Sequence, residues 1–575
     1  MVDYRDAKQG SGQVSGTEVA AQPTADAVRP PGTARRWWAR ARTPAGFTVA
    51  AVVLFTCYLR QSRTISVGSD GASNALQAWD MLHGNLLLHG WFVSDVSFYT
   101  TELPQYMLVE AIRGLGSDVI HVAGAMTYTL LVLLAALAAK GRARGREGAV
   151  RAVLAGGIML APQLGNGTST LLLSPDHTGS AIPVLVLMLL LDRFSPGGWR
   201  PRWYVPVATG VLLVWGLVAD QIVLLIGVIP LALVCAARAY QGLAVRREGL
   251  RSRWYDLSLA AAAVVSVPAA SLATRLIRDH GGWVISPVPT GFASTAAMPK
   301  NFSLTFEGLL ELFGADFFGE QTGRDAAFAF VHLAGLALAV LAIGLAVRHF
   351  LGRELIVGVL ATAIVLNVAA YISSDQVSNI LSTREIAPVL PFAAVLAGRL
   401  LAERVLAARL KYVMAGVLAC YAGMLGFAAA QPAAPPQYAD LAAWLSAHDL
   451  TSGVSGYSEA NIVTLETGGT IQIRPVVANG PFIASRTWEA NRSWYGPSAH
   501  SANFLAISSS AGFDVFEVTA QQASATFGPP AGVYRFGRYT VMVWNENLLT
   551  YLRLCLAVGA LGDLVGHHAE ALRIP

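Results

Sequence analysis

The stretch Val67–Asn85 reads VGSDGASNALQAWDMLHGN and follows an apolar segment, residues 44–60, that is long enough to cross a bilayer. Its apolar residues recur at helical spacing after the GSDG turn, which predicts a helix that begins beside Asp70. Asp is favoured at helix N-caps, so capping alone would explain this carboxylate. The other interpretation is that an acid at the mouth of a membrane span has a function in the loop beyond it.

The composition indicates that membrane spans continue along the chain. Of the 575 residues, 54% are hydrophobic and only 13% are charged, whereas soluble domains contain about 25% charged residues. We expect a polytopic α-helical membrane protein with about 11–12 transmembrane helices. The predicted spans are residues 44–60, 118–139, 149–163, 178–192, 203–219, 221–237, 256–275, 327–347, 354–372, 385–402 and 412–430.

Arginine and lysine gather in every second connection between these spans. Short loops rich in these residues stay in the cytoplasm. The basic connections are residues 35–42, 140–151, 193–202, 238–253, 348–353 and 399–411. This alternation predicts a cytoplasmic N-terminus and a long exported first loop, residues 61–117. It also accounts for the net charge of +5, since the chain has no aromatic-interleaved basic patch typical of nucleic-acid binding.

The composition divides the chain into four regions. Residues 1–43 predict a disordered, basic cytoplasmic tail, and residues 44–431 the multi-span membrane domain. After the proline-rich linker QPAAPPQY, residues 432–547 predict a small extracytoplasmic α+β domain, with a helix at YADLAAWLSAHDL and strands at NIVTLE, TIQIRPVV, NFLAISS, GVYRF and YTVMVW. The apolar tail 548–575 leaves open whether it adds a span. The four cysteines lie far apart in apolar segments and predict neither disulfides nor a zinc site.

Polar and charged side chains collect at the outer ends of the predicted spans, where an ionised group is costly unless it has a role. They are Asp70, Glu102, Asp176, His177, Asp220, Gln221 and Arg384. Because the arginine pattern alone sets the topology, their position on one side predicts a single outward-facing cavity. Each also has a structural interpretation: His177 as an interfacial histidine, Asp220 as a turn residue that accepts backbone hydrogen bonds, and Arg384 as an anchor that reaches the headgroups.

Several of these segments resemble the GT-C superfamily of membrane glycosyltransferases, which includes protein O-mannosyltransferases and aminoarabinose transferases. VGSDGASNALQAWDMLHGN is similar to the first-loop signature of that family, and TTELPQYMLVEAIRGLG to its proline-containing segment. SPDHTGS, the AD of LVADQIV and STREIAPVLPFAAVLAG resemble later family positions, and GYSEANIVTLETGG resembles a pattern of the exported domain. Many members carry two adjacent acids in the first loop, whereas here Gly71 follows Asp70.

The resemblance implies that a sugar moves from a polyprenyl phosphate carrier to an acceptor hydroxyl, with inversion at the anomeric carbon. Asp70 would be the general base, and one carboxylate suffices because phosphate leaves readily without a general acid. Arg384 would hold the departing phosphate, and His177 would add a second donor. The remaining candidates, which would bind the sugar or orient His177, are Glu102, Asp176, Asp220 and Gln221.

Two other functions stay open on the residues alone. A transporter or flippase of lipid-linked sugar would also hold charges in the membrane, although transporters often show interrupted helices near the midplane. An inactive glycan receptor would need far fewer spans. The expected partners are a polyprenyl-phosphate-linked sugar, a glycan, lipid or protein acceptor, and the lipid of a bacterial-type plasma membrane. No cofactor is predicted beyond a divalent metal ion, whose need the residues leave open, as they do the identity of the sugar.

Overall fold

The computed structural model describes residues 33–173, 177–194, 202–319, 323–348, 354–509 and 518–554. Two compact units are distinguished, Met1–Val52 and Val53–Pro575, and both sheets and all cavities belong to the second. The helical elements before residue 430 are α1 (Thr33–Ser62), α2 (Ser69–Leu82), α3 (Leu103–Arg113), α4 (Asp118–Lys140), α5 (Gly145–Ile158), α6 (Asn166–Thr168), η1 (Ser169–Leu173), α7 (Ala181–Phe194), α8 (Tyr204–Ala219), η2 (Leu224–Val228), α9 (Ile229–Tyr240), η3 (Gln241–Val245), α10 (Leu250–Asp279), α11 (Met298–Leu312), α12 (Gly323–Arg348), α13 (Leu355–Ser373), η4 (Ile380–Ile386), α14 (Val389–Ala407) and α15 (Lys411–Ala429).

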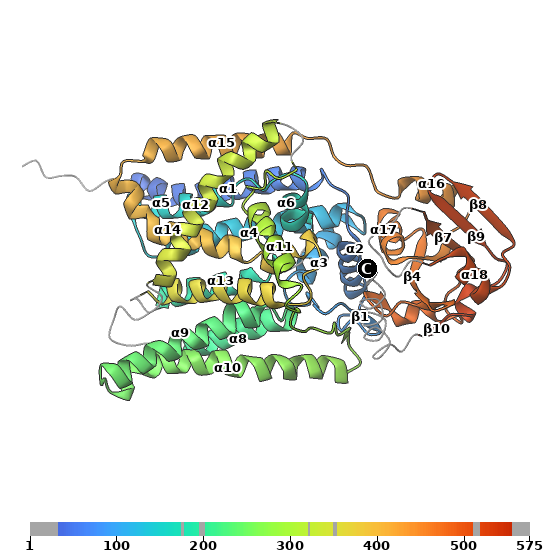
Figure 1. Cartoon of the computed structure of the whole chain (residues 1–575), viewed down its shortest axis with the longest axis horizontal. Coiled ribbons are helices and arrows are strands. Elements are labelled where there is room, and N and C mark those ends of the chain that lie inside the picture. Colours follow the sequence, from blue (N-terminus) through green and yellow to red (C-terminus); the bar gives the residue numbers. More distant parts are fainter. Residues whose placement is uncertain are drawn as a thin grey trace, which may run out of the picture. The chain divides into compact units, whose positions relative to one another are not determined.

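Among the described residues, seven helices are long and apolar enough to cross a membrane, and an eighth is added if the bent pair η4 and α14 counts as one span. The seven are α1 from Ala45 onward, α4, the run from η2 to η3, α10, α12, α13 and α15. Figure 1 shows α8, α9 and α10 side by side, and α10 packs against both of the others. The chain is therefore a polytopic α-helical membrane protein, as its composition predicts.

The predicted spans 149–163 and 178–192 correspond to α5 and α7, which are shorter than predicted at 14 residues each. A helix of that length rises only about 21 Å, less than the roughly 30 Å of hydrocarbon. Their outer ends instead meet irregular segments near Pro162 and His177, and His177 has a left-handed backbone with φ of +51°. Such non-helical backbone is tolerated at membrane depth where protein surrounds it.

Helix α14 is the centre of the bundle. Every residue from Val389 to Arg399 is buried, and the helix packs against α4, α5, α12 and α13. Gly398 permits the closest approach, because a Cβ there would lie 2.5 Å from the backbone oxygen of Arg151 and 2.7 Å from Cβ of Ala139. Small residues serve this purpose in membrane helix interfaces, where backbone proximity replaces the hydrophobic driving force.

Arg399 lies in the buried part of α14 instead of the basic connection where the sequence places it. Its side chain is only 2% exposed. Nε donates to the carbonyl of Ala138 at 2.8 Å, Nη2 lies 3.1 Å from Asp192, and Nη1 contacts Glu354. One guanidinium therefore joins the ends of α4, α7 and α13 to α14, and it satisfies two carboxylates that would otherwise be costly near the hydrocarbon.

A small sheet ties the segment between α2 and α3 to two later parts of the chain. Its order is β2–β1–β6, with β1 (Trp91–Val93), β2 (Val284–Ile285) and β6 (Ala490–Asn491). β1 pairs in parallel with β2, Phe92 opposite Val284, and antiparallel with β6, Trp91 opposite Asn491. The pairing places the loop that follows β5 directly beside α2.

The C-terminal region contains a mixed seven-stranded sheet in the order β10–β5–β4–β3–β7–β9–β8, which confirms the predicted small α+β fold. Its elements are α16 (Ala439–Ala447), β3 (Ser452–Ser455), α17 (Tyr457–Glu466), β4 (Gln472–Asn479), β5 (Phe482–Ser485), η5 (Arg492–Tyr495), β7 (Phe504–Ser508), α18 (Ala520–Phe527), β8 (Gly532–Phe536), β9 (Tyr539–Val543), η6 (Leu548–Thr550) and β10 (Arg553–Leu554). Most of the apolar tail beyond β10 lies outside the described residues.

The strand prediction at NIVTLE is wrong, because this segment lies within helix α17. Residues Ala460–Leu465 are buried without alternation, since α17 is covered by α2 and β4. A short run of β-branched residues that is buried on all sides cannot be told from a strand by its periodicity. The error matters for the site, because α17 begins at Tyr457.

Replacing Arg399 by Gln should lower the melting temperature strongly. The change leaves Asp192 and Glu354 without their cation, and breaking a buried ion pair costs about 3 kcal/mol or more. Thermal unfolding followed by intrinsic fluorescence in detergent would measure it. Arg404→Gln is the matched control, because Arg404 is an exposed residue of the same helix. Equal melting temperatures for the two variants would contradict the role assigned to Arg399.

Candidate active site

Asp70 lies in the first turn of α2. The N-cap of this helix is Gly68 and no side chain caps it, so the interpretation of Asp70 as the N-cap is wrong. The carboxylate instead bridges two distant segments. Oδ2 lies 3.3 Å from Nη1 of Arg384, and Oδ1 accepts a hydrogen bond of 2.8 Å from the hydroxyl of Tyr457. The side chains of Asp70 and Arg384 are 38% and 40% exposed, which leaves both accessible to a ligand.

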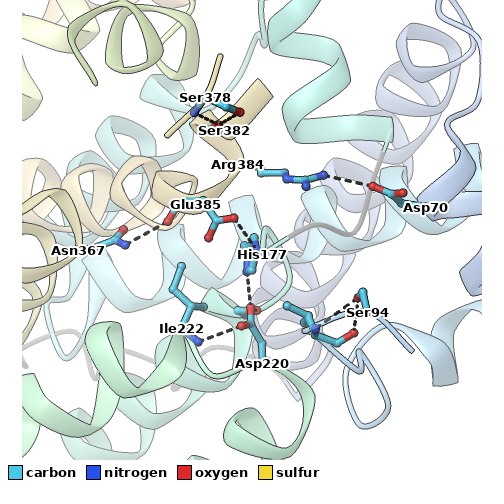
Figure 2. A network of polar contacts seen from close by, with 12 residues as sticks. Asp70, Ser94, His177, Asp220, Ile222, Asn367, Ser378, Ser382, Arg384 and Glu385 are labelled. Atoms are coloured by element: carbon cyan, nitrogen blue, oxygen red, sulfur yellow. Dashed lines mark hydrogen bonds and ion pairs between the residues drawn. The ribbon is translucent and has the colours of Figure 1, made fainter. Parts of the chain in front are cut away.

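Arg384 is positioned by η4. The side chain of Asn379 caps the start of this short helix by accepting from the backbone nitrogen of Leu381 at 2.9 Å. Near its end, the amide of Asn367 on α13 donates to the carbonyl of Glu385 at 3.0 Å. Both contacts fix the helix against the bundle, so that Arg384 faces Asp70 while the next side chain, Glu385, faces His177 (Figure 2).

His177 lies between two carboxylates (Figure 2). Its Nδ1 is 2.7 Å from Oδ2 of Asp220, and its Nε2 is 3.2 Å from Oε1 of Glu385. Asp220 also accepts from the hydroxyl of Ser180 and from the backbone nitrogen of Ile222. The imidazole thereby connects the loop before α7, the end of α8 and η4.

The charges of this cluster follow from their surroundings. Burial alone would lower the pKa of His177, but the carboxylates of Asp220 and Glu385 raise that pKa well above its ordinary value. Burial alone would raise the pKa of Asp220, yet the His177 imidazolium and the hydrogen bonds from Ser180 and Ile222 lower it. At neutral pH the ring is therefore a cation that donates from both nitrogens. Each ring nitrogen therefore faces a carboxylate, Nδ1 that of Asp220 and Nε2 that of Glu385.

Glu102 is buried beside the same loop. It is 1% exposed, it accepts from the hydroxyl of Thr101, and a Cβ at Gly179 would lie 1.9 Å from its Oε1. Burial raises the pKa of this carboxyl to about 8, so Glu102 is mostly protonated at pH 7. Glu102 is therefore a buried, neutral carboxyl group, and it is not among the residues that line the larger cavity.

A cavity of about 850 Å³ lies where these residues meet the C-terminal region. Its volume is within the range of ligand sites, which span about 300–1,000 Å³. The charged side chains that line it are Asp70, Asp95, Arg384, Glu385, Glu459 and Arg538. A second cavity of about 210 Å³ is lined by Ser169, Thr170 and, again, Asp70 and Arg384. The Asp70–Arg384 pair therefore borders both spaces.

Of the two remaining sequence candidates, the structure describes only Gln221. Gln221 is exposed and is not among the residues that line the larger cavity. Asp176 lies outside the described residues. Asp95, whose loop position predicts a solvated acid, is exposed and lines the cavity.

Two partners of the site were missed by the sequence. Tyr457 lies in the GYSEANIVTLETGG segment, whose resemblance to the family was the available signal. Glu489 contacts the Tyr457 hydroxyl but follows no recognisable motif. Within the described ranges, no group of three or more His, Cys, Asp or Glu side chains could hold a metal ion.

The fold and site thus define a polytopic membrane protein with a charged, ligand-sized cavity at one end of its helices. No family model and no curated protein matches the chain. Among solved structures it is similar to ArnT from Cupriavidus metallidurans in the apo state, with 14% identity, a TM-score of 0.49, and coverage of 88% of this chain and 98% of that one. It is also similar to the Archaeoglobus fulgidus oligosaccharyltransferase complex with zinc and sulfate, with 12% identity, a TM-score of 0.43, and coverage of 80% and 67%.

Because both TM-scores lie below 0.5, neither likeness bears on what the cavity of this chain binds.

The imidazolium of His177 should make stability depend on pH. Since its pKa is raised by folding, the stabilisation is complete below the ordinary imidazole pKa of about 6.5 and is lost as the pH rises through the raised value. The melting temperature of His177→Gln should therefore fall furthest below wild type near pH 6, and the difference should shrink in alkaline buffer. The exposed residue His280 provides the control His280→Gln. A difference that stays constant from pH 6 to alkaline buffer would indicate a neutral ring.

Proposed function

We propose that this chain is a membrane glycosyltransferase of the GT-C type that moves a sugar from a polyprenyl phosphate carrier to an acceptor hydroxyl on the exported face. The observation that carries the proposal is the Asp70–Arg384 pair, a carboxylate and a guanidinium 3.3 Å apart that border two cavities at once. Transfer between a lipid-bound donor and a separate acceptor needs two spaces that meet at a base and a cation.

Asp70 is the general base in this proposal. The acceptor oxygen attacks the anomeric carbon, the bond from that carbon to the phosphate oxygen breaks on the opposite face, and the hydroxyl proton passes to the Asp70 carboxylate. Attack opposite the leaving group inverts the anomeric configuration. Because phosphate departs as a stable anion, no second carboxylic acid is required.

Arg384 supports the departing phosphate. Negative charge gathers on the phosphate oxygens as the bond breaks, and a guanidinium holds such oxygens through two parallel hydrogen bonds. The contact to Asp70 orients the guanidinium before the donor arrives and keeps the base ionised until the acceptor binds. His177 contributes indirectly, since it fixes Glu385 in the cavity wall next to Arg384.

Asp70→Asn should abolish sugar transfer while the protein stays folded. Purified protein in lipid vesicles would be given a panel of radiolabelled polyprenyl-phosphate sugars together with a bacterial membrane extract, and label in the acceptor fraction counted. The control Asp279→Asn makes the same exchange at an exposed carboxylate near the end of α10, and its activity should match wild type. Transfer at the normal rate by Asp70→Asn would remove Asp70 as the base. Lipid translocation by wild type without any transfer would favour a flippase instead.

Arg384→Lys should slow transfer even though it keeps the positive charge. A lysine lacks the planar fork, and a hydrogen bond to a charged group is worth about 1.5–3 kcal/mol, or roughly a 10- to 100-fold loss in kcat/KM for the donor. Arg384→Gln should lose more. The release of polyprenyl phosphate at graded donor concentrations measures both variants. An Arg384→Lys enzyme as active as wild type would show that the phosphate is held elsewhere.

A further inference from the structure

The hydroxyl of Tyr457 lies between two carboxylates that belong to different parts of the chain. It is 2.8 Å from Oδ1 of Asp70 at the start of α2, and it also contacts Oε2 of Glu489 just before β6. Tyr457 is the first residue of α17, which packs against α2. The C-terminal region therefore reaches the carboxylate that the proposed function treats as the base.

Glu489 is held in place by an unusual local backbone. It is 2% exposed and has a φ of +49°, a left-handed conformation that costs a non-glycine residue about 1–3 kcal/mol. Two contacts maintain it: the hydroxyl of Ser73 on α2 donates to its carbonyl at 3.2 Å, and the next residue, Ala490, pairs with Phe92 of β1. Strain that the fold maintains in this way is typical of residues with a role beyond packing.

The single hydroxyl proton of Tyr457 therefore lies between the carboxylates of Asp70 and Glu489. A tyrosine hydroxyl has a single proton to donate, so it can hydrogen-bond to only one of two ionised carboxylates at a time, and the two negative charges repel each other. The guanidinium of Arg486 lies 4.3 Å over the Tyr457 ring and offsets part of this negative charge. The other charged groups that line the same cavity as Asp70 are Asp95, Arg384, Glu385, Glu459 and Arg538, of which Arg384 contacts Asp70.

We propose that Tyr457 and Glu489 are positioning residues that set the orientation and the protonation of the Asp70 carboxylate. The inference rests on the proposed function, in which Asp70 is the base. The hydrogen bond from Tyr457 stabilises the ionised form of Asp70, while the negative charge of Glu489 opposes it. The exported domain thereby contributes two side chains to the control of the reaction, in addition to the Tyr438, Glu459 and Arg538 side chains with which it lines the cavity.

The two residues have opposite expected effects, which separates this role from a merely structural one. Tyr457→Phe removes the donor and should move the acid limb of the kcat/KM profile toward higher pH. Glu489→Gln removes the opposing charge and should move the same limb toward lower pH, each by about one unit. Tyr495→Phe is the matched control: its buried hydroxyl donates to the carbonyl of Pro475 in the same domain, and Tyr495 does not line the cavity.

A second measurement reports the protonation of the Asp70 carboxyl group and does not require turnover. Carbodiimides modify protonated carboxyl groups, and mass spectrometry of the peptide that contains Asp70 gives the pH midpoint of its modification in wild type and in each variant. Opposite shifts of the midpoint for Tyr457→Phe and Glu489→Gln, with Tyr495→Phe unchanged, are the expected result. Equal midpoints in all four proteins, or shifts of the same sign, would overturn the proposal. If the midpoints shift as expected but no sugar is transferred by wild type, it is the proposed function that fails.

Discussion

One imidazolium, that of His177, joins three segments that are far apart in the chain. Its two nitrogens face Asp220 at the end of α8 and Glu385 in η4. Because Arg384 adjoins Glu385, the same contact fixes the guanidinium opposite Asp70. A buried carboxylate without its cation is costly, so Asp220 and His177 stabilise each other only together. The position of Arg384 and Glu385 in the cavity wall therefore depends on the charge of the buried His177 ring.

The charges of the bundle are arranged in two separate groups with different consequences. Around Arg399 the side chain has 2% exposure and contacts Ala138, Asp192 and Glu354 on three other segments, which suits a structural link between helices. Around Asp70 and Arg384 the side chains are more than one third exposed and border open space. The first group stabilises the packing of α14, whereas the second remains available to a ligand. Burial, more than residue type, distinguishes the two.

The sequence predicted the parts of the structure that depend on local pattern. Long apolar runs identified the helices. Asp70, His177, Asp220 and Arg384 became site candidates because an ionisable side chain near hydrocarbon is costly. It failed where tertiary contacts decide. Burial on all sides made α17 look like a strand, and the two carboxylates that face the His177 ring come from distant segments that no local pattern connects. Glu489 carries no local signal, since only the pairing of β6 with β1 brings it to Asp70.

The three-stranded sheet β2–β1–β6 has a consequence for biosynthesis. Its strands come from residues 91–93, 284–285 and 490–491, so the central strand leaves the ribosome about four hundred residues before its second partner. At roughly 5–20 residues per second, β1 waits on the order of half a minute with one edge unpaired. During this interval the edge of β1 that later pairs with β6 is open, and an open strand edge is a template for pairing with another chain. An interrupted chain that ends before Glu489 would lack that carboxylate and would keep one edge of β1 open to pairing with another chain.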